Sequence, residues 1–436
     1  MRILTLTQFY PPIIGGEEEH ARLLSHALAR RGHRVAVATL WHEGLPEFEV
    51  EADGVRVYRL RSTTGRLTGL FANGGRRHAP PMPDPEATLA LRRIIARERP
   101  QIVHAHNWLT RSFLPLKAWS GAKLIVTLHN YNLVCAKNTL MRDGAICAGP
   151  APLKCLGCAS HHYGLAKGAV TTLGAFAFSA IERRLVDAYI PVSRAVASSN
   201  QLARGPAAYR IIPTMIPDPA RAEDTQNDEE TFAPYLAQLP QRPFMLFVGA
   251  LGKFKGVEVT LQAHAGLVDA PPLVLIGYPM PDVTLPTPQT HPNVVVLRDW
   301  PRLAVMAAWR RCLFGLVPSV WAEPGPTVAL EVMAAGKALI ASRIGGLLDK
   351  VVEGETGLLT QPGDVTALRA AMQRLLDDPA LCHRMGVAGQ RRARNYYASA
   401  IAARVERVYQ DALGDDPSTA LAVPAMPVAV PLRRPM

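Results

Sequence analysis

Short apolar runs alternate along this chain with longer segments of helical periodicity. The chain opens with the apolar run RILTLTQ (2–8), and a Pro-Pro and Gly-Gly turn (10–16) follows it. Apolar residues then recur with helical spacing over about 17–31, before a second apolar run, HRVAVAT (33–39). Nearly continuous apolar strands joined by helices are typical of parallel sheets that are covered on both faces. The pattern predicts a βαβ unit with a glycine loop at its first crossover, as in nucleotide-binding α/β folds.

The same alternation recurs in both halves of the 436-residue chain, which is too long for one ordinary core. Further strands are predicted at 102–107, 123–130, 187–193 and 210–218, and again at 272–277, 293–299 and 313–318. Between them, residues 219–242 are acidic and then rich in proline, which indicates a linker. We therefore expect an N-terminal α/β domain (1–218) and a C-terminal one (243–394). Residues 414–436, rich in Pro, Ala and Val without a period, are predicted to be disordered.

One stretch of the C-terminal half, WAEPGPTVALEVMAAGKALIAS (321–342), combines a strand end, a Gly/Pro turn and a helix start. Pro326 suits the first helical turn, and Glu323 and Glu331 have seven residues between them. A helix N-terminus at the carboxyl edge of a parallel sheet attracts anions. The two carboxylates there can accept hydrogen bonds from sugar or ribose hydroxyls. The alternative is a buried helix that carries two solvated acids.

Two lysines, Lys253 and Lys255, lie in a predicted strand-to-helix loop earlier in the same half. Ammonium groups in such a loop can neutralise a diphosphate. Solvated lysines are the alternative, and for Lys253 taken alone they are the favoured interpretation.

Histidines gather at predicted strand ends in the N-terminal half, where ligands bind in parallel sheets: His104, His106 and His129. A histidine there can donate a hydrogen bond or transfer a proton near pH 7. His129 and His106 are both candidates for a ligand-binding role, and His104, two residues before His106 on the strand, is more readily structural. His20, on the first helix, either faces the same cleft or packs within the helix layer.

Four of the six cysteines fall close together, at Cys135, Cys147, Cys155 and Cys158. The last two have the Cys-x2-Cys spacing of a metal knuckle, so a structural zinc site with four thiolates is one interpretation, with His161 or His162 as a substitute ligand. Four unligated cysteines in a packed insert (135–162) are the other.

The net charge of +12 suggests an anionic partner, either a nucleotide sugar or an anionic membrane surface. No nucleic-acid-binding module is apparent, so nucleic acid ranks last. The N-terminus reads as a strand rather than a signal peptide, and no uncharged apolar run reaches about 20 residues. We expect a cytoplasmic protein, with peripheral association at the inner face of the membrane as an option. The apolar segment 164–181 is expected to form a packed core helix, with a membrane-surface helix as the alternative.

These motifs, taken together and in order, resemble the retaining glycosyltransferases of family 4. The resemblance rests on the Glu-x7-Glu pattern, the opening string FYPPIIGGEEEHARLLSHALARRGHRVAVAT, the segment TLHNYN, Gly345-Gly346 and ETGLLTQPGD (355–364). It covers residues 1 to about 413. It implies the GT-B fold, in which two Rossmann-like, doubly wound α/β domains face each other across a cleft. In that fold the last helix, here 395–413, returns to the N-terminal domain.

The resemblance also assigns expected roles to residues. Glu323 would contact the donor sugar, His129 would lie against it, and Glu331 would hold the ribose. The donor diphosphate would be bound by residues of both domains: Gly15, Gly16, Lys253, Lys255, and the helix start at Pro326 and Thr327. His106 and His20 would lie on the acceptor side. Ala250 stands where the family usually has an arginine, and Pro324-Gly325-Pro326 replaces the usual Pro-Phe-Gly.

The resemblance implies transfer of a sugar, with retention, from a nucleoside-diphosphate donor to a glycan or lipid-linked acceptor. Cell-surface polysaccharide or glycolipid synthesis is the expected setting, and no cofactor is expected for catalysis. Two alternatives remain open: a GT-B nucleotide-sugar epimerase, and a glycan- or lipid-binding scaffold with an impaired site.

Overall fold

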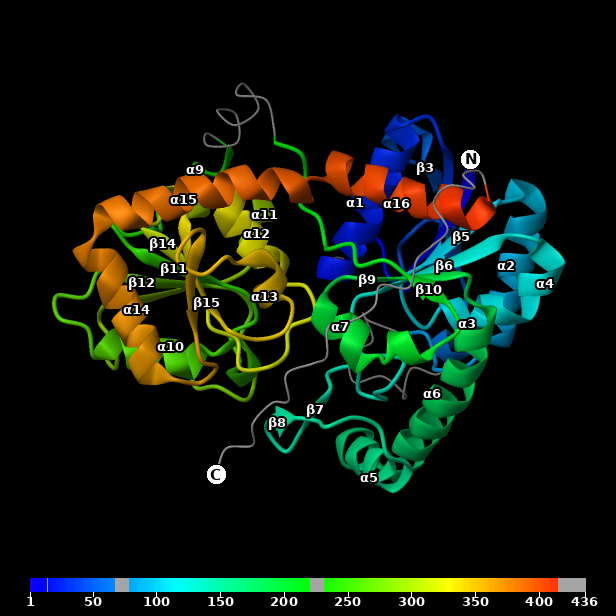
Figure 1. Cartoon of the computed structure of the whole chain (residues 1–436), viewed down its shortest axis with the longest axis horizontal. Helices are drawn as coiled ribbons and strands as arrows, with labels where there is room; N and C mark the ends of the chain where they lie inside the picture. Colours follow the sequence, from blue (N-terminus) through cyan, green and yellow to red (C-terminus); the bar gives the residue numbers. More distant parts are fainter. Residues whose placement is uncertain (14, 67–77, 220–230, 415–436) are drawn as a thin grey trace.

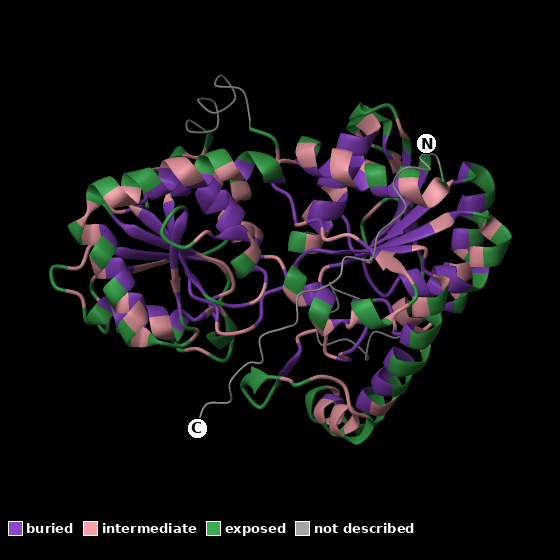
Figure 2. Ribbon diagram, viewed as in Figure 1, coloured by how far each residue is buried: buried purple, intermediate pink, exposed green. Residues whose placement is uncertain are grey.

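The computed structural model describes residues 1–13, 15–66, 78–219 and 231–414. Within this part of the chain, two parallel sheets form the centres of two domains that lie side by side (Figure 1). Figure 2 shows that the strands of both sheets are buried and that the exposed residues lie on the outer faces of the helices. Two predictions fall largely outside the described residues. These are the disordered tail, of which only Gly414 is described, and the linker, of which residues 220–230 are not described.

The N-terminal domain contains an eight-stranded sheet in the order β10-β9-β6-β5-β1-β2-β4-β3. Its strands are parallel except β3, which runs antiparallel to β4 at the edge. The strands are β1 Arg2–Leu6, β2 Arg34–Leu40, β3 Phe48–Val50, β4 Arg56–Leu60, β5 Ile102–Ala105, β6 Lys123–Leu128, β9 Ala188–Pro191 and β10 Ala208–Tyr209. The helices of this domain include α1 Gly16–Arg30, α2 Pro85–Glu98, α3 Thr110–Phe113, α4 Lys117–Ser120 and α7 Arg194–Ser199.

The C-terminal domain contains a six-stranded, fully parallel sheet in the order β13-β12-β11-β14-β15-β16. Its strands are β11 Met245–Val248, β12 Leu273–Ile276, β13 Val294–Leu297, β14 Phe314–Val317, β15 Ala338–Ser342 and β16 Gly357–Thr360. Its helices include α9 Ala233–Leu236, α10 Val257–Ala265, α11 Arg302–Arg311, α12 Thr327–Ala334, α13 Leu347–Lys350, α14 Val365–Asp377 and α15 Pro379–Ala393. The strand order reverses between β11 and β14, and such a switch point opens a crevice for ligands. The doubly wound α/β architecture predicted from the sequence is confirmed.

The last described helix, α16 (Ala398–Leu413), leaves the C-terminal domain and crosses to the N-terminal one (Figure 1). Its apolar face, which includes Ile401, Val405 and Val408, joins the core cluster that contains Leu24 and Leu28 of α1. At its end, the Tyr409 hydroxyl lies 2.6 Å from Nδ1 of His104. Helix α16 therefore forms part of the N-terminal core.

A helical insert projects from the N-terminal domain between β6 and β9. It begins with the hairpin β7 (Met141–Arg142) and β8 (Ala145–Ile146) and continues into α5 (Pro152–Tyr163) and α6 (Leu165–Leu185). The two helices pack closely as a hairpin: a Cβ at Gly168 on α6 would lie 2.4 Å from the Ser160 backbone on α5.

The expectation that 164–181 forms a packed core helix was wrong. The buried face of α6 carries small or polar residues, because Ser179 and Glu182 bind the buried guanidinium of Arg111. The large apolar side chains face outward instead, and Leu165 and Leu173 are 81% and 69% exposed. None of the helices in the described ranges has the length and hydropathy needed to cross a membrane.

Candidate functional site

A cavity of about 390 Å³ lies between the two domains, at the carboxyl ends of β11 and β14. The N-terminal domain contributes Gly16, Glu17, His129, Asn130 and Thr214, and the C-terminal domain contributes, among others, Gly249, Ala250, Lys255, Ser319, Trp321 and 323–328. Six predicted site residues, far apart in the sequence, therefore line one cavity: Gly16, His129, Lys255, Glu323, Pro326 and Thr327.

The carboxylate of Glu323 is the most strongly held acid of this cavity. It is 3% exposed, and it accepts hydrogen bonds from Lys255 Nζ at 2.6 Å and from the Ser319 hydroxyl. Burial by itself raises the pKa of Glu323, but the charge and hydrogen bond of Lys255 outweigh it, so that the pKa lies below its ordinary value. Glu323 is thus ionised and paired with a cation.

Two glycines, Gly345 and Gly346, hold the backbone of Glu323 in place. Gly345 has a φ of +56°, and a Cβ on it would lie 2.4 Å from the carbonyl oxygen of Glu323. The N–H of Gly346 donates to that same oxygen at 2.7 Å. The two loops approach so closely that a side chain at Gly345 would displace the acid.

The start of α12 faces the same cavity. Pro326 precedes the first helical residue, Thr327, and both line the cavity with Val328. The described residues provide no side-chain cap for this helix end. Its first N–H groups are therefore available to an anion. Ala250, which replaces the family arginine, also lines the cavity.

Glu331, on the second turn of α12, lies beside this cavity rather than in its lining. It is buried, and its Oε1 accepts a hydrogen bond from Arg302 Nη2 at 3.1 Å. Nη1 of the same guanidinium donates at 3.0 Å to Glu19, which is on α1 of the other domain. Arg302 therefore bridges the two domains and holds Glu331 in one orientation.

Lys253 does not reach the cavity. Its side chain is 58% exposed, and its Nζ lies 3.8 Å from Glu258. In this arrangement Lys253 does not replace the charge that Ala250 lacks. Gly15 also lies outside the lining, next to Gly16 at the N-cap of α1.

Sequence reasoning missed a second lysine near Glu323. Lys350, on α13, is 1% exposed, and its Nζ donates to the Thr214 hydroxyl at 3.2 Å. Burial lowers the pKa of Lys350 to about 8, although the charges of Asp349 and Glu323 oppose this shift. In the sequence, Lys350 looks like an ordinary solvated lysine at the end of a helix.

Sequence reasoning also missed Glu17. Because Glu17, Glu18 and Glu19 follow one another, they look like a solvated first helical turn. In the structure Glu17 lines the cavity, and Asn107 Nδ2 donates to it at 2.6 Å. Burial and the charge of Glu18 raise the pKa of Glu17 to about 8. The cavity thus contains a carboxyl group that is protonated at neutral pH.

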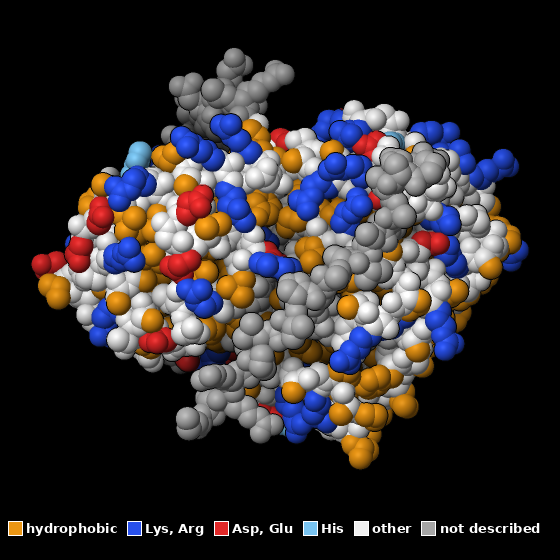
Figure 3. Space-filling view, viewed as in Figure 1, with side chains coloured by type: hydrophobic (Ala, Val, Ile, Leu, Met, Phe, Trp, Pro, Cys, Tyr) orange, Lys and Arg blue, Asp and Glu red, His pale blue; other side chains and the backbone are white. Residues whose placement is uncertain are grey.

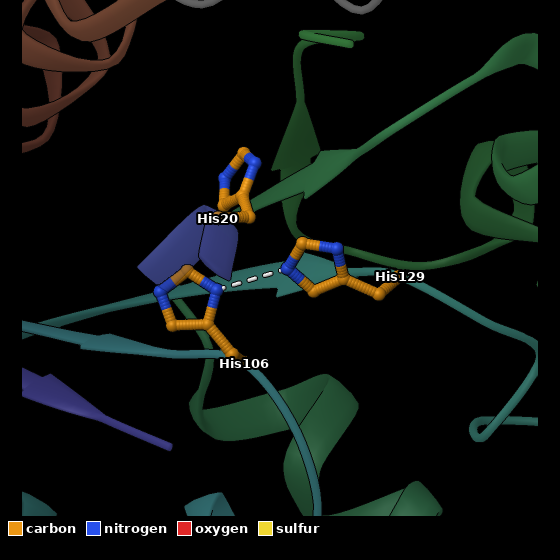
Figure 4. A group of neighbouring side chains, drawn as sticks. All are labelled: His20, His106 and His129. Atoms are coloured by element: carbon orange, nitrogen blue, oxygen red, sulfur yellow. Dashed lines mark hydrogen bonds between the residues drawn. The ribbon is translucent and has the colours of Figure 1, made fainter. Parts of the chain in front are cut away.

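Three histidines form a cluster in the N-terminal domain: His20 on α1, His106 after β5 and His129 after β6 (Figure 4). His129 lines the cavity, whereas the predicted acceptor-side residues His20 and His106 lie outside its lining. Nδ1 of His106 lies 3.0 Å from Nε2 of His129, and the His20 and His129 ring centroids are 4.8 Å apart. Burial lowers the pKa of all three, that of His20 to about 3, so the rings are neutral at physiological pH. Among the described residues, His20 Nδ1 and His106 Nε2 have no hydrogen-bond partner.

This histidine cluster is the one group in the described part of the chain in which three metal-ligand atoms lie within 4.8 Å of one another. Its two unpartnered ring nitrogens, on His20 and His106, are buried, and neither residue lines the cavity. His104, in contrast, has both ring nitrogens bonded, to Tyr409 and Thr127, so its contacts are those of a structural residue.

A larger cavity, of about 730 Å³, lies beside the first, and Asn130 lines both. Its walls are mainly apolar and come from the segment 78–82, Trp108 and α6. Lys137 and Lys167 add two ammonium groups. The four predicted metal-binding cysteines line a third cavity, within the insert.

Comparison with known proteins gives this arrangement a family. Residues 15–214 match the model of the glycosyl transferase 4-like domain, and residues 228–392 match that of the glycosyl transferases group 1. The chain is 28% identical over 415 residues to a glycogen synthase of Mycobacterium tuberculosis, covering 90% of each chain. It is 26% identical over 436 residues to a D-inositol 3-phosphate glycosyltransferase of Pseudarthrobacter chlorophenolicus, covering 95% of this chain and 94% of the relative.

Solved structures give the same fold. Sucrose-phosphate synthase from Thermosynechococcus elongatus superimposes with a TM-score of 0.70 at 21% identity, over 95% of this chain and 99% of that one. The catalytic domain of starch synthase IV from Arabidopsis thaliana, bound to ADP and acarbose, gives 0.64 at 16% identity, over 94% and 99%. With both domains matched by the family models, the chain belongs to the family 4-like GT-B glycosyltransferases.

Proposed function

We propose that this protein is a retaining glycosyltransferase that moves a sugar from a nucleoside-diphosphate donor to a lipid-linked or glycan acceptor. The observation that carries the proposal is the convergence of Lys255, Glu323 and the α12 N-terminus opposite His129 in one interdomain cavity. Relatives of similar fold have been solved with UDP, UDP-glucose or ADP. A donor of this class contains an anionic diphosphate next to a polar sugar. Lys255 and the α12 N-terminus are suited to the diphosphate, and Glu323 and His129 are suited to the sugar hydroxyls.

The chemistry needs stabilisation of a leaving group. The bond between the sugar C1 and the diphosphate oxygen breaks, and negative charge accumulates on the departing nucleoside diphosphate. Lys255 and the free N–H groups of α12 are positioned to bind that charge, and they are held there before the reaction begins. The acceptor oxygen bonds to C1 on the same face, and its proton passes to the leaving phosphate oxygen.

The remaining groups orient the donor. Ionised Glu323 is suited to accept hydrogen bonds from sugar hydroxyls, and neutral His129 is suited to donate one from the opposite wall. Glu331 would bind ribose hydroxyls with the oxygen that Arg302 leaves available. Because Arg302 also binds Glu19 on the other domain, donor binding at Glu331 is coupled to the contact between the domains.

The acceptor proposal rests on the 730 Å³ apolar cavity, which borders the donor cavity at Asn130. A purely polar glycan would leave these apolar walls unused, whereas an acceptor with a lipid or aryl portion would cover them. Figure 3 shows hydrophobic side chains gathered over the α5–α6 insert, with Lys and Arg residues nearby. With the net charge of +12, this supports an acceptor presented at the inner face of an anionic membrane.

The first test is thermal unfolding of the wild type and Lys255→Ala with UDP, GDP, ADP or CDP. A diphosphate at about 100 times its dissociation constant adds roughly 2.7 kcal/mol of stability. We expect one of the four to stabilise the wild type and to have little effect on Lys255→Ala. Lys123→Ala, an exposed lysine on β6 remote from the cavity, is the control and should respond as the wild type does.

Product analysis with the matching sugar nucleotide then separates the reaction classes. A glycoside with the donor's anomeric configuration supports the proposal, and an inverted glycoside contradicts retention. An epimerised nucleotide sugar formed without acceptor would establish the epimerase alternative. Absence of any diphosphate binding would favour a scaffold with an impaired site.

A further inference from the structure

The four cysteines of the N-terminal insert surround one very small cavity. Cys135, Cys147, Cys155 and Cys158 all line it, although up to 23 residues separate them in the sequence. The space is about 20 Å³. One water or small ion needs roughly 10–15 Å³ of accessible volume. The cavity therefore has room for a single small ion but not for a polynuclear cluster.

The local fold brings the cysteines to this cavity from two directions. Cys135 lies in the loop before the β7–β8 hairpin, and Cys147 directly follows β8, where its N–H donates to Leu140 at 2.7 Å. Cys155 and Cys158 lie three residues apart near the start of α5, hence on the same face of that helix. A loop, a hairpin and a helix thus meet at the sulfur atoms.

Polar and positive groups lie around these sulfur atoms. The Cys155 sulfur accepts a hydrogen bond from the N–H of Ala151 at 3.4 Å, and the Cys147 thiol donates to the Gly149 carbonyl oxygen at 3.4 Å. The side chains of Lys137 and Lys154 also line the cavity. Two ammonium groups beside the cavity would offset part of the negative charge of a four-thiolate site.

The part of the insert that carries the cysteines buries few of its own side chains. Within 135–158 only Ala136, Leu140 and Met141 are buried. Leu140 has a φ of +55° and Asn138 one of +63°, conformations that non-glycine residues rarely adopt. Such backbone persists where the surrounding structure fixes it strongly, and the apolar contacts of this segment are too few to do so.

From these observations, we infer that the four cysteines bind one Zn²⁺ ion, which fixes the insert. Four thiolates at about 2.3 Å form a closed tetrahedral site of the structural kind, and thiolates select zinc over hard cations. In the present structure no three of these sulfur atoms lie within 4.8 Å of one another. Binding therefore requires side-chain rotations that bring the four sulfur atoms closer together.

The zinc site would shape the neighbouring acceptor cavity. Lys137 lines both cavities, and Asn138 next to it lines the larger one. Cys158 is on α5, which packs against α6, and α6 forms an apolar wall of the larger cavity. Fixing the four sulfur atoms therefore fixes two walls of that cavity. The site would act by positioning these walls and would take no part in bond making or breaking.

The test is metal analysis of the full-length, untagged protein, purified under reducing conditions from zinc-supplemented medium. Elemental analysis should give about one Zn²⁺ per chain. Cys155→Ser and Cys158→Ser should each lose it. Two control variants should keep the zinc. One is Cys382→Ser, which changes a partly buried cysteine of the C-terminal domain, and the other is His106→Ala. Circular dichroism of each variant shows whether the remainder of the chain is folded.

Two further measurements use the wild type and need no variant. Replacement of zinc by Co²⁺ should give the intense near-ultraviolet charge-transfer bands of thiolate ligands. An alkylating reagent should modify Cys155 and Cys158 only after the zinc has been removed by a chelator, and mass spectrometry detects this modification.

Three results would overturn the inference. The first is a fully reduced protein that binds no stoichiometric zinc even after reconstitution. The second is zinc that persists in Cys155→Ser but is lost in His106→Ala, which would place the ion in the histidine cluster. The third is a protein mass showing that these cysteines form disulfides when purified from the cytoplasm.

Discussion

The Nζ of Lys255 lies 2.6 Å from a carboxylate oxygen of Glu323, and both side chains line the cavity between the domains. The ammonium group of Lys255 thereby helps to keep the buried carboxylate of Glu323 ionised. A bound diphosphate would compete with Glu323 for Lys255, which frees the carboxylate for the donor sugar. The pair links the two halves of the donor site through a single hydrogen bond.

Lys255→Ala should therefore affect both binding and chemistry. Loss of one group that stabilises developing negative charge typically costs about 10²–10³ in kcat, and here Glu323 is also left buried without its cation. Steady-state kinetics with the identified donor measure this. Lys253→Ala is the comparison, since that ammonium group lies outside the cavity, 3.8 Å from Glu258. Equal losses in both variants would show that the total charge of the loop, rather than the position of Lys255, binds the diphosphate.

Glu331→Gln and Glu19→Gln form a second matched pair, because each removes one carboxylate from the same guanidinium of Arg302. If Glu331 binds ribose, its replacement should raise the donor KM by about tenfold, the effect of roughly 1.4 kcal/mol. Glu19→Gln should change the donor KM much less. Similar KM values for the two variants would mean that Glu331 acts through the bridge between the domains and makes no contact with ribose.

Gly345→Ala should damage the site through crowding of the backbone. The added Cβ would lie 2.4 Å from the Glu323 carbonyl oxygen, at a φ of +56°. Gly363→Ala is the control, because Gly363 has a φ of +80° but open space around it. The control should lose about 1–2 kcal/mol from the free energy of unfolding and keep its activity. Gly345→Ala should lose more stability and most of its activity, and identical behaviour of the two variants would contradict this account.

The carboxyl group of Glu17 predicts a pH dependence of stability. Its pKa is about 8 in the folded protein, against an ordinary value of 4.5. Between these values the unfolded chain has released the proton and the folded one has not, so this contribution to stability is complete below about 4.5 and is lost as pH rises to about 8. Glu17→Gln should raise Tm progressively between pH 5 and pH 8. Glu43→Gln, at an exposed glutamate, should leave the curve of Tm against pH unchanged.

Substitutions at two apolar residues of α6 test acceptor binding and membrane attachment independently. Both residues are exposed, Val170 to 56% and Leu173 to 69%, but Val170 lines the apolar cavity and Leu173 does not. Val170→Asp should raise the KM for an acceptor with an apolar portion, while the donor KM remains unchanged. Leu173→Asp should weaken binding to anionic vesicles in a sedimentation assay. Unchanged acceptor kinetics in Val170→Asp would remove this cavity from the acceptor site.

The sequence by itself determined the architecture. Apolar strands of four to seven residues separated by amphipathic helices leave few options other than parallel sheets covered on both faces, and the chain folds into two such domains. The family could also be recognised from the sequence, because the Gly-Gly loop, TLHN and the two glutamates occur in order at predicted strand ends. Each of these motifs consists of residues that are close together in the sequence, so it can be recognised without knowing the tertiary structure.

Only the tertiary structure decided how side chains from distant segments meet. Glu17 looks solvated in a run of three acids, yet it lines the interdomain cavity beside Asn107, 90 positions away, and desolvation there raises its pKa to about 8. Lys350 is buried because α13 packs against Thr214 of the other domain, and Lys253 points to solvent although it lies two positions from Lys255. Helix α6 hides its polar face because the Arg111 guanidinium lies beneath it. Burial and pairing are properties of packed surfaces, and no local pattern encodes which surfaces will meet.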